Sequence, residues 1–364
     1  MKKKILFLLH LKNSMHGAGI VNNNIIKIKN LKKKYKISYI DISTTQKLEE
    51  INIFKISKII LFFKIYIHLF YKLLIYRPNY VYISMSIIGY GFYKDSLIVL
   101  LCKLFRIKII FHLHRKGIQS IIRNSYLKLV YYRFIFRKSK IIHLSKLLFN
   151  DLNNLLINDE DKFFLHNGIK TYRQSKNKSK FLNAVFLSNL FKSKGIYELL
   201  KSFKILNKQG YKKKIFLNIV GDCTAEIQLK DIKDYINKNG LNQNVKYFGK
   251  KNTLQKYNIL NKCNFMVFPT KDDCFPLCIL EGMSCGLAIL STRQGAIPEM
   301  VINNYNGFLI KKSDPKLISN KIKRYIQNKK KLKEHSINSK IRFYKNFTIK
   351  HFENNLFNIL TKII

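Results

Sequence analysis

The sequence predicts an α/β protein with two doubly wound, Rossmann-like domains, each built on a parallel sheet. Short apolar segments alternate with longer amphipathic ones along most of the chain, which is typical of parallel strands joined by right-handed helical crossovers. About ten such strands are too many for one small open sheet. The 364 residues are enough for two hydrophobic cores.

Five strands are expected in each half, and each is a short run rich in β-branched, aromatic or leucine side chains. In chain order they are Lys4–Leu9, Ile37–Ile42, Tyr80–Ser84, Lys108–His112, Lys140–Leu144, Asn183–Ser188, Phe216–Val220, Val245–Phe248, Phe265–Phe268 and Ala288–Ser291. Most neighbours are far enough apart for a helix between them. The last stretch, from about Pro315 to Ile364, is helical in pattern, and no strand follows it.

A polar stretch near the middle divides the chain. Residues 171–180 combine serine, asparagine and glutamine with lysine and arginine, a composition typical of a linker. We therefore expect an N-terminal domain over residues 1–170, a linker over 171–180 and a second domain over 181–340. A C-terminal helix over 341–364 is expected to pack back toward the first domain.

Composition bounds the class of protein. Apolar residues make up 47% of the chain, which excludes wholesale disorder. The formal net charge is +48, which permits a polyanionic partner such as nucleic acid or an anionic membrane. The alternative is that most of these lysines lie on solvated faces and reflect genome composition. No RNA- or DNA-binding motif is present, so we expect no nucleic acid partner.

The N-terminus and the cysteines favour a cytoplasmic protein. Lys2, Lys3 and Lys4 precede only five apolar residues and no small-residue cleavage site follows, so a buried strand fits better than a signal peptide. No long uncharged apolar run occurs, and we predict no transmembrane helix. None of the six cysteines forms a Cys-x-x-Cys pair, so reduced thiols are expected rather than disulfides or a metal site.

One amphipathic stretch, Lys55–Tyr76, has two interpretations. Lys64, His68 and Lys72 are four residues apart and so share one helix face. The opposite arc is apolar and comprises Ile59, Phe62, Phe63, Tyr66, Phe70 and Leu73. A basic amphipathic helix suits a membrane interface, and residues 96–150 add twelve basic and no acidic side chains. The alternative is a core-facing helix with a solvated lysine stripe.

The stretch from Phe265 to Ile310 carries the chemistry. After the strand, Pro276 stands where a helix can begin, and Glu281 follows about one turn later. This places a helix N-terminus at the carboxyl end of a parallel sheet, where α/β proteins bind ligands and phosphates. Asp273 and Glu281, eight residues apart, would then flank the ligand and contact its hydroxyl groups. The alternative is that Asp273 caps the helix and Glu281 is a surface residue.

This stretch resembles the carboxylate-x7-carboxylate signature of retaining GT-B glycosyltransferases, the glycosyl transferases group 1 family, also called family 4. The resemblance rests on Cys274-Phe275-Pro276-Leu277, Leu280-Glu281-Gly282-Met283, Gly286, Gly295, Ile297-Pro298-Glu299 and Asn306-Gly307-Phe308. Weaker matches in the expected order are His16-Gly17-Ala18-Gly19, His112-Leu113-His114, His166-Asn167-Gly168-Ile169, Lys194-Gly195, Val220-Gly221-Asp222 and Phe248-Gly249. It implies the GT-B architecture, in which two such domains face each other across a cleft.

The resemblance also implies residue roles. Glu281 would hold the ribose of a nucleotide sugar, Asp273 its sugar, and Lys194 the diphosphate. The amides of Leu277 and Cys278, after Phe275 and Pro276, would receive the phosphates. His114 would lie near the transferred sugar, Lys250 and Lys251 near the base, and Gly17 toward the donor phosphate and the acceptor. Asp273, His114 and Lys194 are the candidates for catalysis.

Three departures from the family pattern stand out. Asp273 replaces the usual glutamate, and the adjacent Asp272 leaves open which aspartate is active. Ser188-Asn189 replaces a glycine-arginine pair, so the donor-site position Asn189 lacks the arginine that would grip diphosphate. Lys192 or Lys194 must supply that charge without a bidentate fork. Gln294 stands where an acidic or small residue is common.

The resemblance implies transfer with retention, without metal or cofactor, the leaving phosphate taking the acceptor proton. The one Asp-x-Asp match, at residues 159–161, is interpreted as an acidic loop. We expect sugar transfer from a nucleotide-diphosphate sugar, with UDP-sugars favoured, to a lipid-linked or surface glycan of lipopolysaccharide or capsule type. The protein would be peripheral on the inner face of the cell membrane. The alternatives are a non-catalytic membrane-associated scaffold, a related hydrolase or phosphorylase, or a nucleic-acid-binding protein; the donor sugar, base and linkage stay open.

Overall fold

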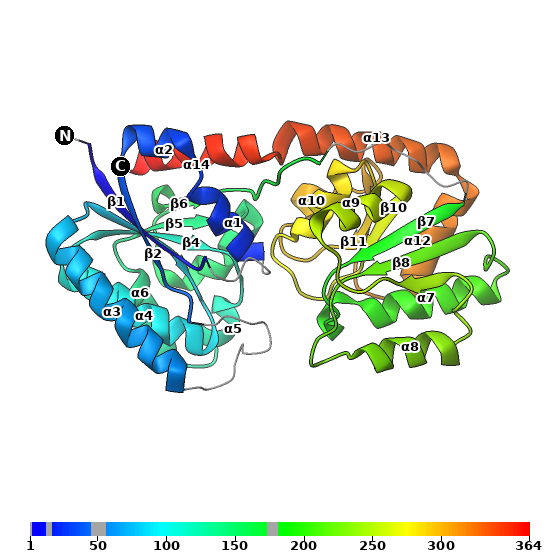
Figure 1. The fold of residues 1–364 in the computed structure, drawn as a ribbon, viewed down its shortest axis with the longest axis horizontal. Coiled ribbons are helices and arrows are strands. Elements are labelled where there is room, and N and C mark those ends of the chain that lie inside the picture. Colours follow the sequence, from blue (N-terminus) through cyan, green and yellow to red (C-terminus); the bar gives the residue numbers. More distant parts are fainter. Residues whose placement is uncertain (1, 12–16, 45–55, 173–180) are drawn as a thin grey trace. The chain divides into compact units, whose positions relative to one another are not determined.

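The computed structural model describes residues 2–11, 17–44, 56–172 and 181–364 (Figure 1). The chain forms two compact units. Unit 1 comprises Met1–Asn167 and Lys350–Ile364, and unit 2 comprises Gly168–Ile349. Each contains one six-stranded sheet in which every pairing is parallel, so the predicted α/β class with two doubly wound sheets is confirmed.

The sheet of unit 1 has the strand order β2-β1-β3-β4-β5-β6. Its strands are β1 (Lys4–Leu9), β2 (Lys36–Asp41), β3 (Tyr80–Met85), β4 (Lys108–Leu113), β5 (Lys140–His143) and β6 (Lys162–Phe164). Its helices are α1 (Gly17–Ile25), α2 (Lys29–Lys34), α3 (Ile56–Tyr76), α4 (Gly89–Leu104), α5 (Ile118–Ile122), α6 (Tyr126–Phe136) and most of α14 (Ile349–Ile363), with the 3₁₀ segments η2 (Lys146–Leu155) and η3 (Asp159–Asp161).

The sheet of unit 2 has the strand order β12-β11-β10-β7-β8-β9. Its strands are β7 (Leu182–Leu187), β8 (Ile215–Val220), β9 (Val245–Tyr247), β10 (Phe265–Phe268), β11 (Ala288–Thr292) and β12 (Gly307–Ile310). Its helices are η4 (Lys192–Lys194), α7 (Ile196–Lys208), α8 (Leu229–Lys238), α9 (Thr253–Lys262), α10 (Leu277–Ser284), α11 (Ile297–Met300), α12 (Pro315–Gln327) and α13 (Lys329–Asn346).

All ten predicted strands are present, with ends that differ by at most one residue. Two further strands, β6 and β12, were not predicted. Strand β6 is a three-residue edge strand without a fully buried side chain, and its apolar run is too short to indicate a strand by itself. Strand β12 is only four residues long and directly follows an asparagine-rich turn, where turn residues dominate the local pattern.

The unit boundaries differ from the predicted domain limits. The first boundary lies between Asn167 and Gly168, ahead of the expected 171–180 linker, of which residues 173–180 lie outside the described part. The second lies between Ile349 and Lys350 rather than at 341. The reason is that α13 continues unbroken to Asn346 and packs on α10 and β11 of unit 2.

The buried face of helix α3 differs from the apolar arc predicted from its sequence. Ile65, Leu69 and Leu73 form the buried stripe in the core of unit 1. The predicted apolar arc is split, because Leu73 is buried while Phe63 and Phe70 are exposed. By its length and composition alone, α3 could also cross a membrane, and 17% of its apolar 18-residue segment is buried in the structure. No membrane-spanning helix was predicted from the sequence.

Candidate functional site

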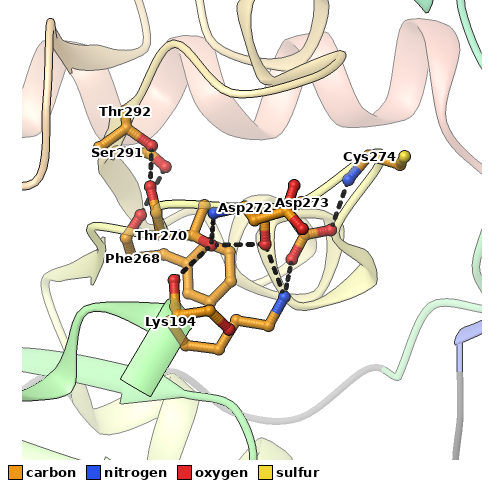
Figure 2. Close-up of polar contacts among 9 residues, drawn as sticks. Lys194, Phe268, Thr270, Asp272, Asp273, Cys274, Ser291 and Thr292 are labelled. Carbon is orange, nitrogen blue, oxygen red and sulfur yellow. Dashed lines mark hydrogen bonds and ion pairs between the residues drawn. The ribbon is translucent and has the colours of Figure 1, made fainter. Parts of the chain in front are cut away.

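The predicted stretch Phe265–Ile310 spans β10 to β12, and its loop with Asp272 and Asp273 lies at the carboxyl end of the unit 2 sheet, between β10 and α10 (Figure 2). Strand β10 is fully buried, and the loop after it is fixed by hydroxyl groups of the neighbouring strand. Ser291 donates to the carbonyl of Phe268, and Thr292 donates to the carbonyl of Thr270, each at 2.6 Å. These bonds tie the loop to β11 and so determine where Asp273 lies.

Lys194 and Asp273 form an ion pair in this loop, with 2.8 Å between Nζ and Oδ2. Nζ also donates to the main-chain carbonyl of Asp272 at 2.9 Å, and Oδ1 of Asp273 accepts from the amide of Cys274 at 2.9 Å. Both charged side chains are about four-fifths buried. The carboxylate that meets Lys194 is therefore that of Asp273, while Asp272 contributes its backbone oxygen.

A glycine contact brings Lys194 to the loop. Gly195 has φ of +78°, and a Cβ atom there would lie 2.1 Å from the carbonyl oxygen of Pro269. Only glycine permits this approach, because any side chain would push η4 away from the loop after β10. Lys192 is held on the other side of the turn, where its amide donates to Glu226 Oε2 at 2.9 Å.

The N-terminus of α10 has no side-chain cap. Its cap residue is Pro276, and Leu277 and Cys278 begin the helix. The carboxylate of Asp273 instead accepts a hydrogen bond from the amide of Cys274. The alternative interpretation, in which Asp273 caps the helix, is therefore wrong. The first-turn amides and the helix dipole therefore favour an anion at this end.

Glu281 lies on α10 and is paired with a lysine from another helix. Its Oε1 is 2.5 Å from Nζ of Lys256 on α9, and the side chains are 16% and 21% exposed respectively. Burial raises the pKa of Glu281, and the charge and hydrogen bond of Lys256 lower it in part. Glu281 is therefore not the surface residue of the alternative interpretation. Lys256 was not predicted, because it lies 25 residues earlier in an ordinary helical pattern.

The remaining unit 2 candidates lie around the ends of β7 and β8. Asn189 accepts from the amide of Asp222 at 3.2 Å, and Asp222 pairs with Lys250 at 3.3 Å. Lys250 is half exposed, so its contact with Asp222 is weak. Phe275, next to the α10 terminus, is buried against Phe347 and supports the loop by packing.

Gly17 and His114 belong to unit 1. Gly17 begins α1 and is exposed, whereas His16 lies outside the described residues. Neither buried ring nitrogen of His114 has a hydrogen-bond partner among the described residues. Burial, reinforced by His10, lowers the pKa of His114 to about 3, so the ring is neutral at pH 7. The ring of His112 lies beside it, tilted by 48°, with the ring centroids 4.1 Å apart.

Among the described residues, no group of three or more His, Cys, Asp or Glu side chains is arranged to hold a metal ion. The six cysteines are free thiols. Asp159–Asp161 forms a 3₁₀ turn ahead of β6, where Asp159 and Asp161 pair with Lys162 and Lys140.

Comparison with known proteins gives a family. The family described as Glycosyl transferases group 1 matches residues 169–342. An uncharacterized glycosyltransferase of Methanocaldococcus jannaschii is 27% identical over 229 residues, which is 63% of this chain and 61% of that protein. The capsular polysaccharide biosynthesis glycosyltransferase CapM of Staphylococcus aureus is 29% identical over 143 residues, which is 39% of this chain and 36% of that protein.

Among solved structures, HepE from Anabaena in complex with UDP superimposes with a TM-score of 0.77 at 17% identity, covering 100% of both chains. At that identity the likeness shows the fold alone, which is GT-B. The match spans about three-fifths of the length of the first curated relatives (61% and 57%).

Proposed function

Because residues 169–342 match the glycosyl transferases group 1 family, we propose that the protein is a glycosyltransferase whose donor is a nucleotide-diphosphate sugar. The observation that carries this proposal is the Lys194–Asp273 pair beside the uncapped N-terminus of α10. A lysine and open helix amides together suit a diphosphate, and the adjacent carboxylates suit sugar and ribose hydroxyls. UDP is the favoured nucleotide, in keeping with the UDP bound to the fold neighbour HepE.

The chemistry follows from the charge that develops on the leaving group. The acceptor hydroxyl oxygen attacks the anomeric carbon, the bond from that carbon to the β-phosphate oxygen breaks, and the acceptor proton passes to the leaving phosphate. Lys194 and the amides of Leu277 and Cys278 stabilise the negative charge on the diphosphate. Asp273 orients the sugar, Glu281 binds the ribose, and no metal or cofactor is needed in this scheme. Retention of the anomeric configuration is part of the proposal.

We propose a lipid-linked or cell-surface glycan as the acceptor, of lipopolysaccharide or capsule type. One relative is named for capsular polysaccharide biosynthesis, which supports this class. His114, neutral and with both ring nitrogens unpaired among the described residues, is suited to hydrogen-bond a sugar hydroxyl without adding charge.

We propose that the protein acts at the cytoplasmic face of the cell membrane. This proposal is supported by the exposed surface of α3. Opposite its buried stripe, this helix exposes large apolar side chains, namely Ile56, Ile59, Ile60, Phe63, Ile67, Phe70, Tyr71, Leu74 and Ile75. Lys64 and His68 are exposed along one edge of that surface. Helix α4 contacts both α3 and α6; α4 also exposes Tyr90 and Leu104, and α6 exposes Tyr126, Leu127 and Phe134. Apolar side chains edged by lysines match the chemistry of an anionic bilayer.

Vesicle co-sedimentation tests the membrane proposal. Each lysine near an anionic bilayer contributes about 1 kcal/mol, and salt screens this attraction. Binding should require anionic lipid, and should fall when Phe63→Ser, Ile67→Ser and Lys64→Glu are combined. Lys72 is left unchanged because it donates to Ser38 within unit 1. Equal recovery in the supernatant with and without anionic vesicles would contradict the proposal.

A matched control uses two equally exposed apolar residues of α13 in unit 2, Ile337 and Ile341. The variant Ile337→Ser/Ile341→Ser removes similar apolar area from a helix outside the proposed surface. It should co-sediment as well as the wild type. Loss of binding in this variant would mean that general hydrophobicity, rather than the α3 surface, drives association.

A thermal-shift screen against UDP-, GDP- and ADP-sugars tests the donor proposal, because a ligand at a hundred times its Kd stabilises the folded state by about 2.7 kcal/mol. Hydrolysis or transfer of the stabilising donor then distinguishes an enzyme from a non-catalytic scaffold that only binds it. Stabilisation by RNA or DNA without any response to sugar nucleotides would favour the nucleic-acid alternative.

A further inference from the structure

The ion pair between Lys256 and Glu281 has no counterpart in the predicted roles. The two side chains come from different helices of unit 2, and four-fifths of each is buried. Lys256 lies just inside the N-terminus of α9, which is fixed by a capping box between Asn252 and Gln255. The neighbouring Tyr257 is almost fully buried, and Lys256 Nζ lies 5.6 Å from its ring centroid. The lysine is therefore held in place from its own helix.

The contact engages one oxygen of Glu281 only. Oε1 takes the lysine, and Oε2 has no hydrogen-bond partner among the described residues. A carboxylate arranged in this way has one oxygen anchored and the other available to a hydroxyl group. The anchoring group is a cation, so it also offsets the cost of keeping a buried carboxylate ionised.

We propose that Lys256 is a positioning residue for the nucleotide: it keeps Glu281 ionised and oriented to accept hydrogen bonds from the ribose. This inference rests on the proposed function for the ligand, but the relation between the two side chains is independent of it. In this role Lys256 does not need to contact the nucleotide. Its effect is transmitted through the charge and position of Glu281.

The surroundings of Glu281 leave Lys256 as its principal charged neighbour. Tyr257 from α9 and Cys278 from α10 also face it, and burial raises the pKa of both, so both are neutral from pH 6 to 9. Lys194 and Asp273 also interact electrostatically with Cys278, but they form an ion pair with each other. Tyr172 and Cys285 lie next to Tyr257. Burial raises the pKa of Glu281 and Lys256 opposes that rise, so removing the lysine moves the pKa further up.

The test compares Lys256→Met with the wild type in UDP binding from pH 6 to 9 by calorimetry. In the variant, Glu281 becomes protonated as the pH falls through its raised pKa, so affinity should decline at the acid end of this range. We expect the ratio of wild-type to variant affinity to rise as the pH falls from 9 to 6, because a protonated Glu281 no longer accepts hydrogen bonds as a carboxylate. Taking the ratio at each pH cancels the titration of UDP itself.

Two variants separate charge from structure. Lys256→Arg keeps the cation and should restore the wild-type pH profile, while Lys262→Met removes an exposed lysine at the other end of the same helix and should change nothing. A loss of UDP affinity in Lys256→Met that is equal at every pH would overturn the proposal, because a merely structural role has no reason to follow Glu281 ionisation.

A second measurement needs no ligand. In protein labelled with carbon-13 on the glutamate carboxyl, the Glu281 signal is assigned by its absence in Glu281→Gln, and its pKa is read directly in wild type, Lys256→Met and Lys256→Gln. The Glu281 pKa should be higher in both lysine variants than in the wild type, because the cation that opposes the effect of burial is gone. An unchanged pKa overturns the inference. A raised pKa in a protein that binds neither UDP, GDP nor ADP supports the Lys256–Glu281 relation and refutes the proposed function instead.

Discussion

Replacing each partner of the Lys194–Asp273 pair should move nucleotide affinity in different directions. In the ligand-free site the lysine already has two acceptors, Asp273 Oδ2 at 2.8 Å and the Asp272 carbonyl at 2.9 Å. A bound diphosphate must therefore exchange one anionic partner for another. A hydrogen bond to a charged group is worth about 1.5–3 kcal/mol. Because Lys194 gives up one anionic partner to bind another, its net contribution to UDP affinity should be at the lower end of this range. Lys194→Met should weaken UDP binding by about tenfold.

Asp273→Asn should act oppositely on binding. It releases Lys194 and removes a negative charge near the phosphates, and two unit charges 6 Å apart interact by about 3 kcal/mol at an effective dielectric constant of 20. UDP affinity should therefore be kept or rise, while sugar transfer or hydrolysis should fall because Asp273 orients the sugar. The free energy of unfolding should drop by about 1–3 kcal/mol in each variant, since four-fifths of each side chain is buried and the remaining partner loses its hydrogen bond.

Calorimetry with UDP and UMP provides the assay. UMP lacks the second phosphate, so it should lose less affinity than UDP in Lys194→Met. Equal losses for both nucleotides would mean that the lysine supports the loop rather than the diphosphate. Loss of UDP binding in Asp273→Asn as well as in Lys194→Met would refute the exchange of partners outright.

The remaining predictions concern the ribose, the backbone and the cation. Glu281→Gln should keep the fold and weaken donor binding by about 1.5–3 kcal/mol, the worth of a hydrogen bond to a charged acceptor, measured by calorimetry. Gly195→Ala should lower the free energy of unfolding by more than 2 kcal/mol, because the new Cβ meets the Pro269 carbonyl at 2.1 Å; Gly210→Ala, with φ of +82° and nothing within 4 Å, should cost only about 1 kcal/mol in denaturant titrations. Transfer activity should survive excess EDTA, because Lys194 and the α10 dipole supply the positive charge; strict dependence on Mn²⁺ or Mg²⁺ would contradict this scheme.

The strands could be predicted because a buried parallel strand is a continuous apolar run, as in Phe265–Phe268. The loop and helix around Asp273 could be placed because Pro276 marks the helix start and the family resemblance supplies the roles. The role of Lys256 could not be predicted, because its partner Glu281 is on another helix and no helical or strand periodicity relates residues 25 positions apart. The α3 surface was misjudged for a related reason. Periodicity shows that a helix has an apolar side, but only the packed structure shows that the buried stripe is Ile65, Leu69 and Leu73.

The two carboxylates of the candidate site share one electrostatic arrangement. Asp273 is paired with Lys194 from η4 and Glu281 with Lys256 from α9, so the four side chains sum to zero formal charge. Two unpaired carboxylates beside the α10 N-terminus would repel a diphosphate and would favour protonation of the more buried one. Paired, they stay anionic acceptors for hydroxyl groups without that repulsion. In the proposed scheme Lys194 also has a second role that Lys256 lacks, because it contacts the loop ahead of the uncapped N-terminus of α10 and would change partners when a diphosphate binds. The chemistry therefore requires one lysine that moves its contact and one that keeps it, which is why exchanging Lys256 for arginine should be tolerated.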